Sequence, residues 1–595
     1  MTSFFLKPSI FHKMNRLAVL IFAGWMMPME ASAELQHPEG SELYEISDSI
    51  EGNYLAAYVA GLRRDMRASS IYYQQLLLEK PKDEDLKNRA FVTSLADGDL
   101  DNVFEIAKSI YRTDKKNSLA QFALIVQDMK KRHFKAARKT LRPALNPPKR
   151  DLAAILLTAW AFAGSKDRAA AERTLNYIAD ATPLTLIRNF HMGLIKGLFG
   201  DKGGAVKYLE MAYRADTSAL KFADAYARAL SVQGNTKRAI EVYKRFDRQI
   251  PNHPIVTDAL KRLEAGETLK PLINSVDEGT VEVLYAMSAV GRQPGGELSS
   301  ILYLQLALYL EPDDAMSVMT LADVFQRVKQ YDETIKVLSN LPDDSPVRPY
   351  ADVETGYALS NADKKDEALA FLRKRAEIRP DDVDLLSALG DILRNQENWA
   401  EAIEVYSKAV DLVGIPESKN WILFFSRGTA YERNKQWPEA EADLQKALDL
   451  MPQGQSFGRA QVLNYLGYSW VDRNKNIDSA FKMLQEAISL APRDAAIIDS
   501  LGWAYYRLKR YDEAVRELER AIELKPSDPV LNDHLGDAYW RVGRENEARF
   551  QWQHSLDAKP EPEAENLIKR KLEIGLDAAL AENKNAEDET ISEKP

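Results

Sequence analysis

The 595-residue sequence contains no cysteine, and this absence excludes several kinds of covalent bond and functional site. Without thiols the chain has no disulfides, no thiolate nucleophile, and no cysteine-ligated zinc or iron–sulfur cluster. A lipoprotein anchor, which is built on a cysteine, is excluded too. The fold must therefore be held together by packing alone.

Positive charge is also scarce, because 79 lysines and arginines face 89 acidic residues and the net charge is −10. An acidic chain lacks the electrostatic footprint that nucleic acid or an anionic membrane surface requires. Neither is therefore expected as a partner. Hydrophobic residues make up 45% of the chain and charged residues 28%, which is typical of a folded protein.

Long apolar runs are rare, and the clearest lies near the amino terminus. Cations up to Arg16 precede an uncharged run over residues 17–29, which is followed by Ala31, Ser32 and Ala33. This order is typical of an export signal cleaved after Ala33, with the start at Met1 or Met14. The run is shorter than the roughly 20 residues that span a bilayer, so an uncleaved membrane anchor is the less favoured alternative. We expect a periplasmic protein with no stable membrane insertion after cleavage.

The rest of the chain is repetitive, and two successive segments show the period best. Residues 500–526 read SLGWAYYRLKRYDEAVRELERAIELKP, and residues 534–560 read HLGDAYWRVGRENEARFQWQHSLDAKP. Positions 34 apart match in both, among them Gly502 with Gly536 and Ala514 with Ala548. Small residues at these positions let two antiparallel helices approach closely. Asp528 suits a helix N-cap and Pro529 the first helical position.

Leu-Gly, a Tyr three residues after the Gly, and then Ala and Pro at a 34-residue period resemble the tetratricopeptide-repeat (TPR) motif. The resemblance implies an all-α fold, a TPR superhelical solenoid of antiparallel helix pairs. The resemblance also implies that this solenoid is non-catalytic and presents a concave groove to proteins or peptides. The chain is expected to divide into a signal peptide (1–33), a degenerate amino-terminal TPR segment (50–263), a linker or bend (264–280), a carboxy-terminal TPR segment (281–562), a capping helix (563–581) and a disordered acidic tail (582–595).

No pattern for catalysis or cofactor binding stands out. The seven histidines are scattered, and phosphate loops, dinucleotide fingerprints and nucleophile elbows are missing from the sequence. The nearest candidate is Asp533 with Asp537, one helical turn apart, and a solvated acidic face explains this pair better than a catalytic one. We therefore predict neither enzymatic activity nor a cofactor nor a metal site.

The predicted binding surface is a stripe on the first helix of each of the last three full repeats. Interfaces favour its aromatic and arginine side chains, and its recurring Asn and Asp could accept N–H groups of an extended peptide. The alternative is that the aromatics pack on the neighbouring repeat and the charges form local ion pairs. The predicted residues are Asn464, Tyr468, Asp499, Trp503, Tyr506, Arg507, Asp533, Asp537, Trp540 and Arg541.

Residues 463–560 are more specific than a generic repeat. They resemble exported TPR proteins of Gram-negative bacteria, some of which are adaptors that present substrates to carboxyl-terminal processing proteases of the cell envelope. This resemblance implies a scaffold or adaptor whose partners include an envelope protease and its substrates. Two alternatives are a structural scaffold for polysaccharide export and a TPR-fused enzyme, although the repeats leave little room for a catalytic domain.

Overall fold

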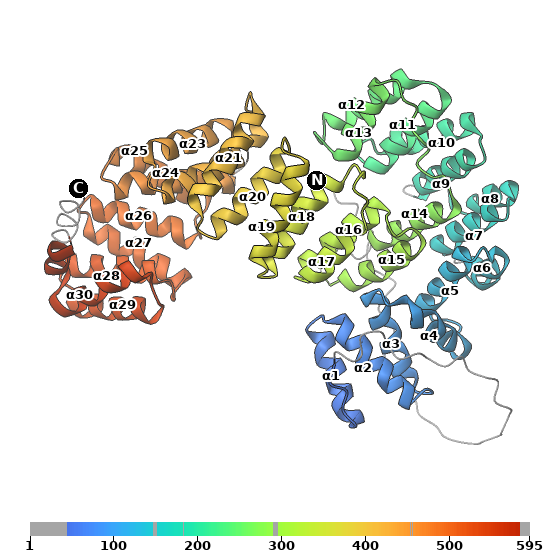
Figure 1. Cartoon of the computed structure of the whole chain (residues 1–595), viewed down its shortest axis with the longest axis horizontal. Coiled ribbons are helices and arrows are strands. Elements are labelled where there is room, and N and C mark those ends of the chain that lie inside the picture. The colour runs from blue at the N-terminus through green and yellow to red at the C-terminus, as the bar shows by residue number, and fades with distance from the viewer. Residues whose placement is uncertain are drawn as a thin grey trace. The chain divides into compact units, whose positions relative to one another are not determined.

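The computed structural model describes residues 44–146, 151–181, 184–289, 295–452, 454 and 456–583 (Figure 1). The predicted signal peptide (1–33) lies outside these residues, as does most of the predicted tail (582–595). The described residues form two compact units, which divide between residues 167 and 168. This division falls before α8 and not at the predicted linker.

The described part of the first unit consists of helices. They are α1 (Ile50–Leu62), α2 (Met66–Glu79), α3 (Glu84–Asp97), α4 (Leu100–Thr113), α5 (Ser118–Lys130), α6 (Phe134–Leu141), the short helix η2 (Arg142–Leu145) and α7 (Leu152–Gly164).

The described part of the second unit is also built of helices. Its helices are α8 (Arg168–Leu175), α9 (Leu184–Leu198), α10 (Lys202–Ala215), α11 (Leu220–Gln233), α12 (Thr236–Asp247), α13 (Pro254–Glu264), α14 (Val276–Ser288), α15 (Glu297–Leu310), α16 (Ala315–Arg327), α17 (Tyr331–Leu338), α18 (Arg348–Asn361), α19 (Lys365–Ile378), α20 (Val383–Asn395), α21 (Trp399–Val413), η4 (Ser418–Asn420), α22 (Trp421–Arg433), α23 (Trp437–Leu450), α24 (Ser456–Asp472), α25 (Ile477–Leu490), α26 (Ala495–Arg507), α27 (Tyr511–Leu524), α28 (Pro529–Arg541), α29 (Glu545–Asp557) and α30 (Pro562–Ile574).

Within each unit the helices form antiparallel pairs, and consecutive pairs pack side by side, so the predicted all-α solenoid is confirmed. Close approach within a pair depends on glycine. A Cβ on Gly502 would lie 2.7 Å from Leu518 Cγ, and one on Gly536 would lie 2.5 Å from Trp552 Cδ1. Ala514 is fully buried beside them. The small residues thus make room for a large side chain from the second helix.

The predicted helix starts are also confirmed. Asp528 caps α28 by accepting hydrogen bonds from the backbone N–H groups of Val530 and Leu531, and Pro529 occupies the first helical turn. Asp314 and Asp382 cap α16 and α20 in the same way. These side chains satisfy N–H groups that have no partner within the helix.

The predicted linker at 264–280 differs from the structure. Residues 276–280 already belong to α14, and the non-helical segment 265–275 packs along α11 with Leu269 and Ile273 buried. An ion pair of 2.5 Å between Lys221 of α11 and Glu282 of α14 spans the segment. The two side chains are only 18% and 8% exposed. Because these contacts cross the segment, the helical pattern breaks here without loosening the chain.

The predicted capping helix (563–581) forms two pieces. The helix α30 ends at Ile574, and Gly575 with φ of 83° separates it from a further helical stretch over residues 576–583. Residues 582 and 583, predicted as the start of the tail, belong to this stretch, and Glu582 pairs with Arg570.

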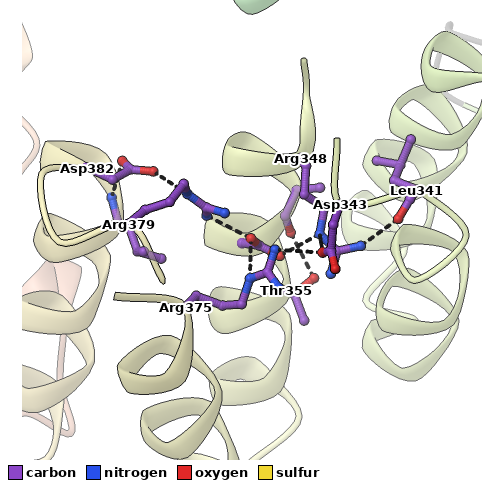
Figure 2. A network of polar contacts seen from close by, with 10 residues as sticks. Leu341, Asp343, Arg348, Thr355, Arg375, Arg379 and Asp382 are labelled. Atoms are coloured by element: carbon purple, nitrogen blue, oxygen red, sulfur yellow. Dashed lines mark hydrogen bonds and ion pairs between the residues drawn. The ribbon is translucent and has the colours of Figure 1, made fainter. Parts of the chain in front are cut away.

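A buried ionic cluster joins α18 to α19 (Figure 2). Asp352, whose side chain is 0% exposed, accepts hydrogen bonds from Arg348 Nε at 2.9 Å, Arg375 Nε at 2.6 Å and Arg379 Nη2 at 2.7 Å. Arg375 also pairs with the exposed Asp343 at 3.0 Å. One buried carboxylate therefore pairs with guanidinium groups from both helices of the repeat and from the turn that follows.

Candidate functional site

The predicted stripe residues lie on α24, α26 and α28, the first helices of three successive pairs. Several of them face the neighbouring first helix rather than open solvent. Asp499 of α26 is buried, and its carboxylate lies 2.9 and 3.0 Å from Nδ1 of His534 on α28. Because a carboxylate only accepts, this nitrogen carries the proton. Asp499 is thus engaged within the solenoid.

Trp503 lies between two other rings. Its ring centroid is 4.6 Å from that of Tyr506 and 4.1 Å from that of His534, with interplanar angles of 5° and 14°. The ring is half-buried, and its Nε1 is buried without a hydrogen-bond partner among the described residues. Trp503 therefore packs against the neighbouring repeat, which was the alternative to a role in binding.

The acidic pair on α28 is covered by α30. Lys571 is 2% exposed, and its Nζ lies 2.8 Å from both Asp533 and Asp537. Asp537 also accepts a hydrogen bond of 2.9 Å from Trp552 Nε1. Burial, together with the nearby Asp533 charge, raises the pKa of Asp537 to about 6 although Lys571 opposes the shift. The expectation of a solvated acidic face is therefore wrong.

The last aromatic and arginine of the stripe are also partly engaged. Arg541 Nε donates to the Tyr506 hydroxyl at 3.1 Å, and its Nη1 pairs with Asp577 at 2.5 Å. Burial raises the pKa of Tyr506 to about 12. Trp540 packs against Gly575, where an added Cβ would lie 2.7 Å from the indole. The chain after α29 thus closes this end of the stripe.

The stripe stays more open on α24 and α26. Asn464 and Tyr468 of α24 are half-buried, and the Asn464 Oδ1 is buried without a partner among the described residues. Burial raises the pKa of Tyr468 above its ordinary value. Arg507 of α26 is half-buried and pairs with no acidic side chain in the described part of the chain. These residues, with the accessible edges of Trp503 and Tyr506, form what we call the open stripe.

The recurring Asn and Asp side chains, predicted to accept N–H groups of an extended peptide, are not all free to do so. Asn464, Asp499 and Asp533 recur as predicted, but His534 occupies the carboxylate of Asp499 and Lys571 that of Asp533. A peptide backbone would have to displace these partners. Sequence reasoning missed both, although a signal existed for His534, which stands beside the recurring acidic position. The sequence gives no such signal for Lys571, because this residue reaches α28 only through the packing of α30 against it.

The His534 site predicts a pH-dependent stability. Burial alone would lower the pKa of His534, but the carboxylates of Asp499, Asp533 and Asp537 and the hydrogen bond to Asp499 raise it above its ordinary value, with Lys571 nearby. A raised pKa in the folded state stabilises the protein below the unfolded-state value, and this contribution is lost as pH rises through the folded value. We expect the carboxy-terminal repeats to unfold at a lower temperature at pH 8 than at pH 6.

Thermal unfolding of His534→Gln, followed by hydrogen exchange in α26–α30, checks this. The variant should lose most of the difference in unfolding temperature between pH 6 and pH 8. Replacing the exposed His554 of α29 with glutamine should leave that difference unchanged. An equal pH dependence in both variants would contradict the assignment to His534.

The described residues include no cluster of three His, Asp or Glu side chains that could hold a metal ion. No helix among them is both long and apolar enough to cross a bilayer.

Comparison with known sequences identifies the repeats. A model of the tetratricopeptide repeat matches residues 353–414 and 387–454, and a TPR repeat model matches residues 502–543. A TPR repeat-containing protein of Pseudomonas aeruginosa is 31% identical over 150 residues, which are 25% of this chain and 24% of that protein. This chain thus spans about a quarter of that relative's length.

Solved structures resemble the chain at low sequence identity. The Cut9–Hcn1 hetero-tetramer of the APC/C is 14% identical with a TM-score of 0.38, covering 89% of this chain and 97% of that chain. YrrB, a TPR protein with an unusual peptide-binding site, is 19% identical with a TM-score of 0.26, covering 34% and 95%. A tetratricopeptide repeat protein from Parabacteroides merdae is 16% identical with a TM-score of 0.32, covering 50% and 98%.

Proposed function

Since this chain is a tetratricopeptide-repeat protein, we propose that it is a non-catalytic scaffold or adaptor of the bacterial cell envelope. It binds partner proteins or their extended segments along its carboxy-terminal repeats. TPR folds are typical of protein-interaction scaffolds.

One observation supports the position of the binding site on the open stripe. Trp503 and Tyr506 stack in parallel with half-buried rings, and Arg507 next to them is half-buried without an acidic partner among the described residues. Tryptophan, tyrosine and arginine supply most of the binding energy at protein interfaces. A guanidinium left unpaired beside rigid rings suits a partner's carboxylate or backbone carbonyl, which it can bind in a bidentate manner. The open stripe is therefore the surface that a partner contacts.

The envelope location rests on the order of charged, apolar and small residues at positions 7–33. The likeness of residues 463–560 to protease adaptors supports a carboxyl-terminal processing protease and its substrates as the partners. The absence of cysteine favours a mature protein without a lipid anchor.

Arg507→Glu tests the proposal, because it reverses the unpaired charge and leaves the stacked rings of Trp503 and Tyr506 in place. Fractionation of the native host should first place the protein in the periplasm with the mass of a chain starting at Glu34. The wild type should then capture the same partners from envelope extract repeatedly, and the variant should retain at least tenfold less of them with unchanged helicity. A tenfold loss corresponds to about 1.4 kcal/mol of binding free energy.

The control is Arg516→Glu on α27, which makes the same charge change on an exposed second helix and should capture partners normally. Full-length protein in the cytoplasm would contradict the envelope location. Equal capture by both variants would exclude the open stripe as the binding surface. A polysaccharide synthase among the captured partners would favour the alternative scaffold.

A further inference from the structure

A second surface lies far along the chain from the open stripe, on helices α10, α11 and α12 (Figure 1, green). There the side chains line an open groove of about 630 Å³. This volume is within the range of about 300–1,000 Å³ that is typical of ligand sites. The groove contains four arginines, Arg214, Arg238, Arg245 and Arg248, and we call it the arginine groove.

The arginine groove has an excess of positive charge in an acidic protein. It contains only two acidic residues, Glu210 and Glu241. Glu210 pairs with Arg214 at 2.6 Å and with Arg238 at 2.7 Å, so one carboxylate serves two guanidinium groups. Arg245 and Arg248 are exposed and make no ion pair within the described part of the chain. Two cations, three residues apart at the end of α12, are therefore available to a ligand.

The groove has a rigid aromatic floor. Tyr213 and Tyr226 stack with their ring centroids 5.4 Å apart, at 6% and 1% exposure. Burial raises the pKa of Tyr213, and the charges of Arg245 and Arg248, which line the same groove, oppose this shift. The Tyr226 hydroxyl is buried and forms no hydrogen bond with the described residues. A buried polar group without a partner is costly, and a ligand acceptor would remove that cost.

We propose that the arginine groove binds an acidic segment of a partner protein, through at least two Asp or Glu side chains. The planar guanidinium groups of Arg245 and Arg248 match carboxylates in bidentate geometry, and the Tyr226 hydroxyl can donate a further hydrogen bond. The arginines of this site are on the second helices of their pairs, α10 and α12, whereas the open stripe is on first helices. The arginine groove would give the scaffold a second binding surface for partners. This proposal does not depend on binding at the open stripe.

The charges of the groove favour a peptide over a phosphate polymer. Glu210 and Glu241 lie among the arginines. They would repel a continuous strand of phosphates, whose binding depends on neutralising many charges at once. Carboxylates spaced along a flexible peptide can reach the free guanidinium groups and avoid the glutamates.

The test is direct binding of a labelled, carboxy-terminally amidated hexaglutamate peptide to the full chain at about 0.15 M ionic strength, where distant charges are screened. The wild type should bind it, and hexaglutamine should not bind. Arg245→Glu combined with Arg248→Glu should weaken binding at least tenfold. Tyr226→Phe should weaken it severalfold without lowering the melting temperature, because the hydroxyl it removes has no partner.

The matched control is Arg173→Glu combined with Lys237→Glu, an equal charge change at exposed residues outside the groove. It should bind within twofold of the wild type, as should Arg507→Glu, which separates this site from the open stripe. An equal loss in the control would show general attraction and overturn the proposal. Unchanged binding in the double variant or in Tyr226→Phe would overturn it too, as would tripolyphosphate binding more tightly than the peptide.

Discussion

Replacing Asp352 with alanine is expected to lower the free energy of unfolding of its repeats by about 3–5 kcal/mol, the cost of breaking a buried ion pair by removing one partner. The loss is large because Asp352 is fully buried and faces Arg348, Arg375 and Arg379. Without it, three guanidinium groups repel one another in a region with little water. The exposed Asp343 can compensate Arg375 and Arg348 only from the surface.

Urea unfolding combined with hydrogen exchange over α18–α20 measures this effect. Since repeats contact mainly their neighbours, protection should fall there before it falls in distant helices. The control is Asp332→Ala, which removes an exposed carboxylate paired with Lys364 and should leave the unfolding midpoint unchanged. If both variants unfold alike, the buried cluster does not stabilise the solenoid.

Lys571→Met should release the carboxy-terminal cap. Methionine keeps the length of the side chain but leaves Asp533 and Asp537 without their cation, at an expected cost of about 3–5 kcal/mol. The pKa of Asp537, already raised to about 6, should rise further. A carboxyl group with a raised folded-state pKa loses its stabilising contribution as pH rises through that value. The variant should therefore be least stable at neutral and higher pH.

Hydrogen exchange in α28–α30 at pH 5 and pH 8 tests this prediction. Adding Asp533→Asn and Asp537→Asn to Lys571→Met should recover most of the protection, because no buried charge is then left unpaired. Lys569→Met, at an exposed position of the same helix, should behave like the wild type. A failure of the neutral triple variant to recover would mean that Lys571 acts through packing and not through its charge.

The regular part of the fold followed from local rules that act within one repeat. The spacing of Gly502 and Ala514, the cap at Asp528 and the Pro at 529 each reflect contacts or turns inside a helix pair, and the structure agrees with them. The segment 264–280 was misread for the same reason. Gly266 and Pro271 do end the helical pattern, but Leu269 and Ile273 are held by α11, a helix that local pattern does not relate to them.

The candidate site was predictable in its residue types and less so in its partners. Trp503, Tyr506 and Arg507 do lie on a first helix with part of their surface accessible. The repeat register could not tell that His534 would stack on Trp503, because the register gives positions along a helix and not the separation of neighbouring helices. The arginine groove was not predicted, since its arginines come from two helices and the net charge of the chain hides a local excess.

The pairing of Lys221 with Glu282 also affects how the chain acquires its structure during synthesis. The two residues are 61 apart in sequence, farther than the 34-residue period of the repeats. At roughly 5–20 residues per second, a ribosome needs about 3–12 seconds to pass from one to the other. During this interval Lys221 has no anionic partner in α14, so α11 cannot complete its packing when its own repeat is made. Maturation of this region is therefore delayed until a later helix has been translated.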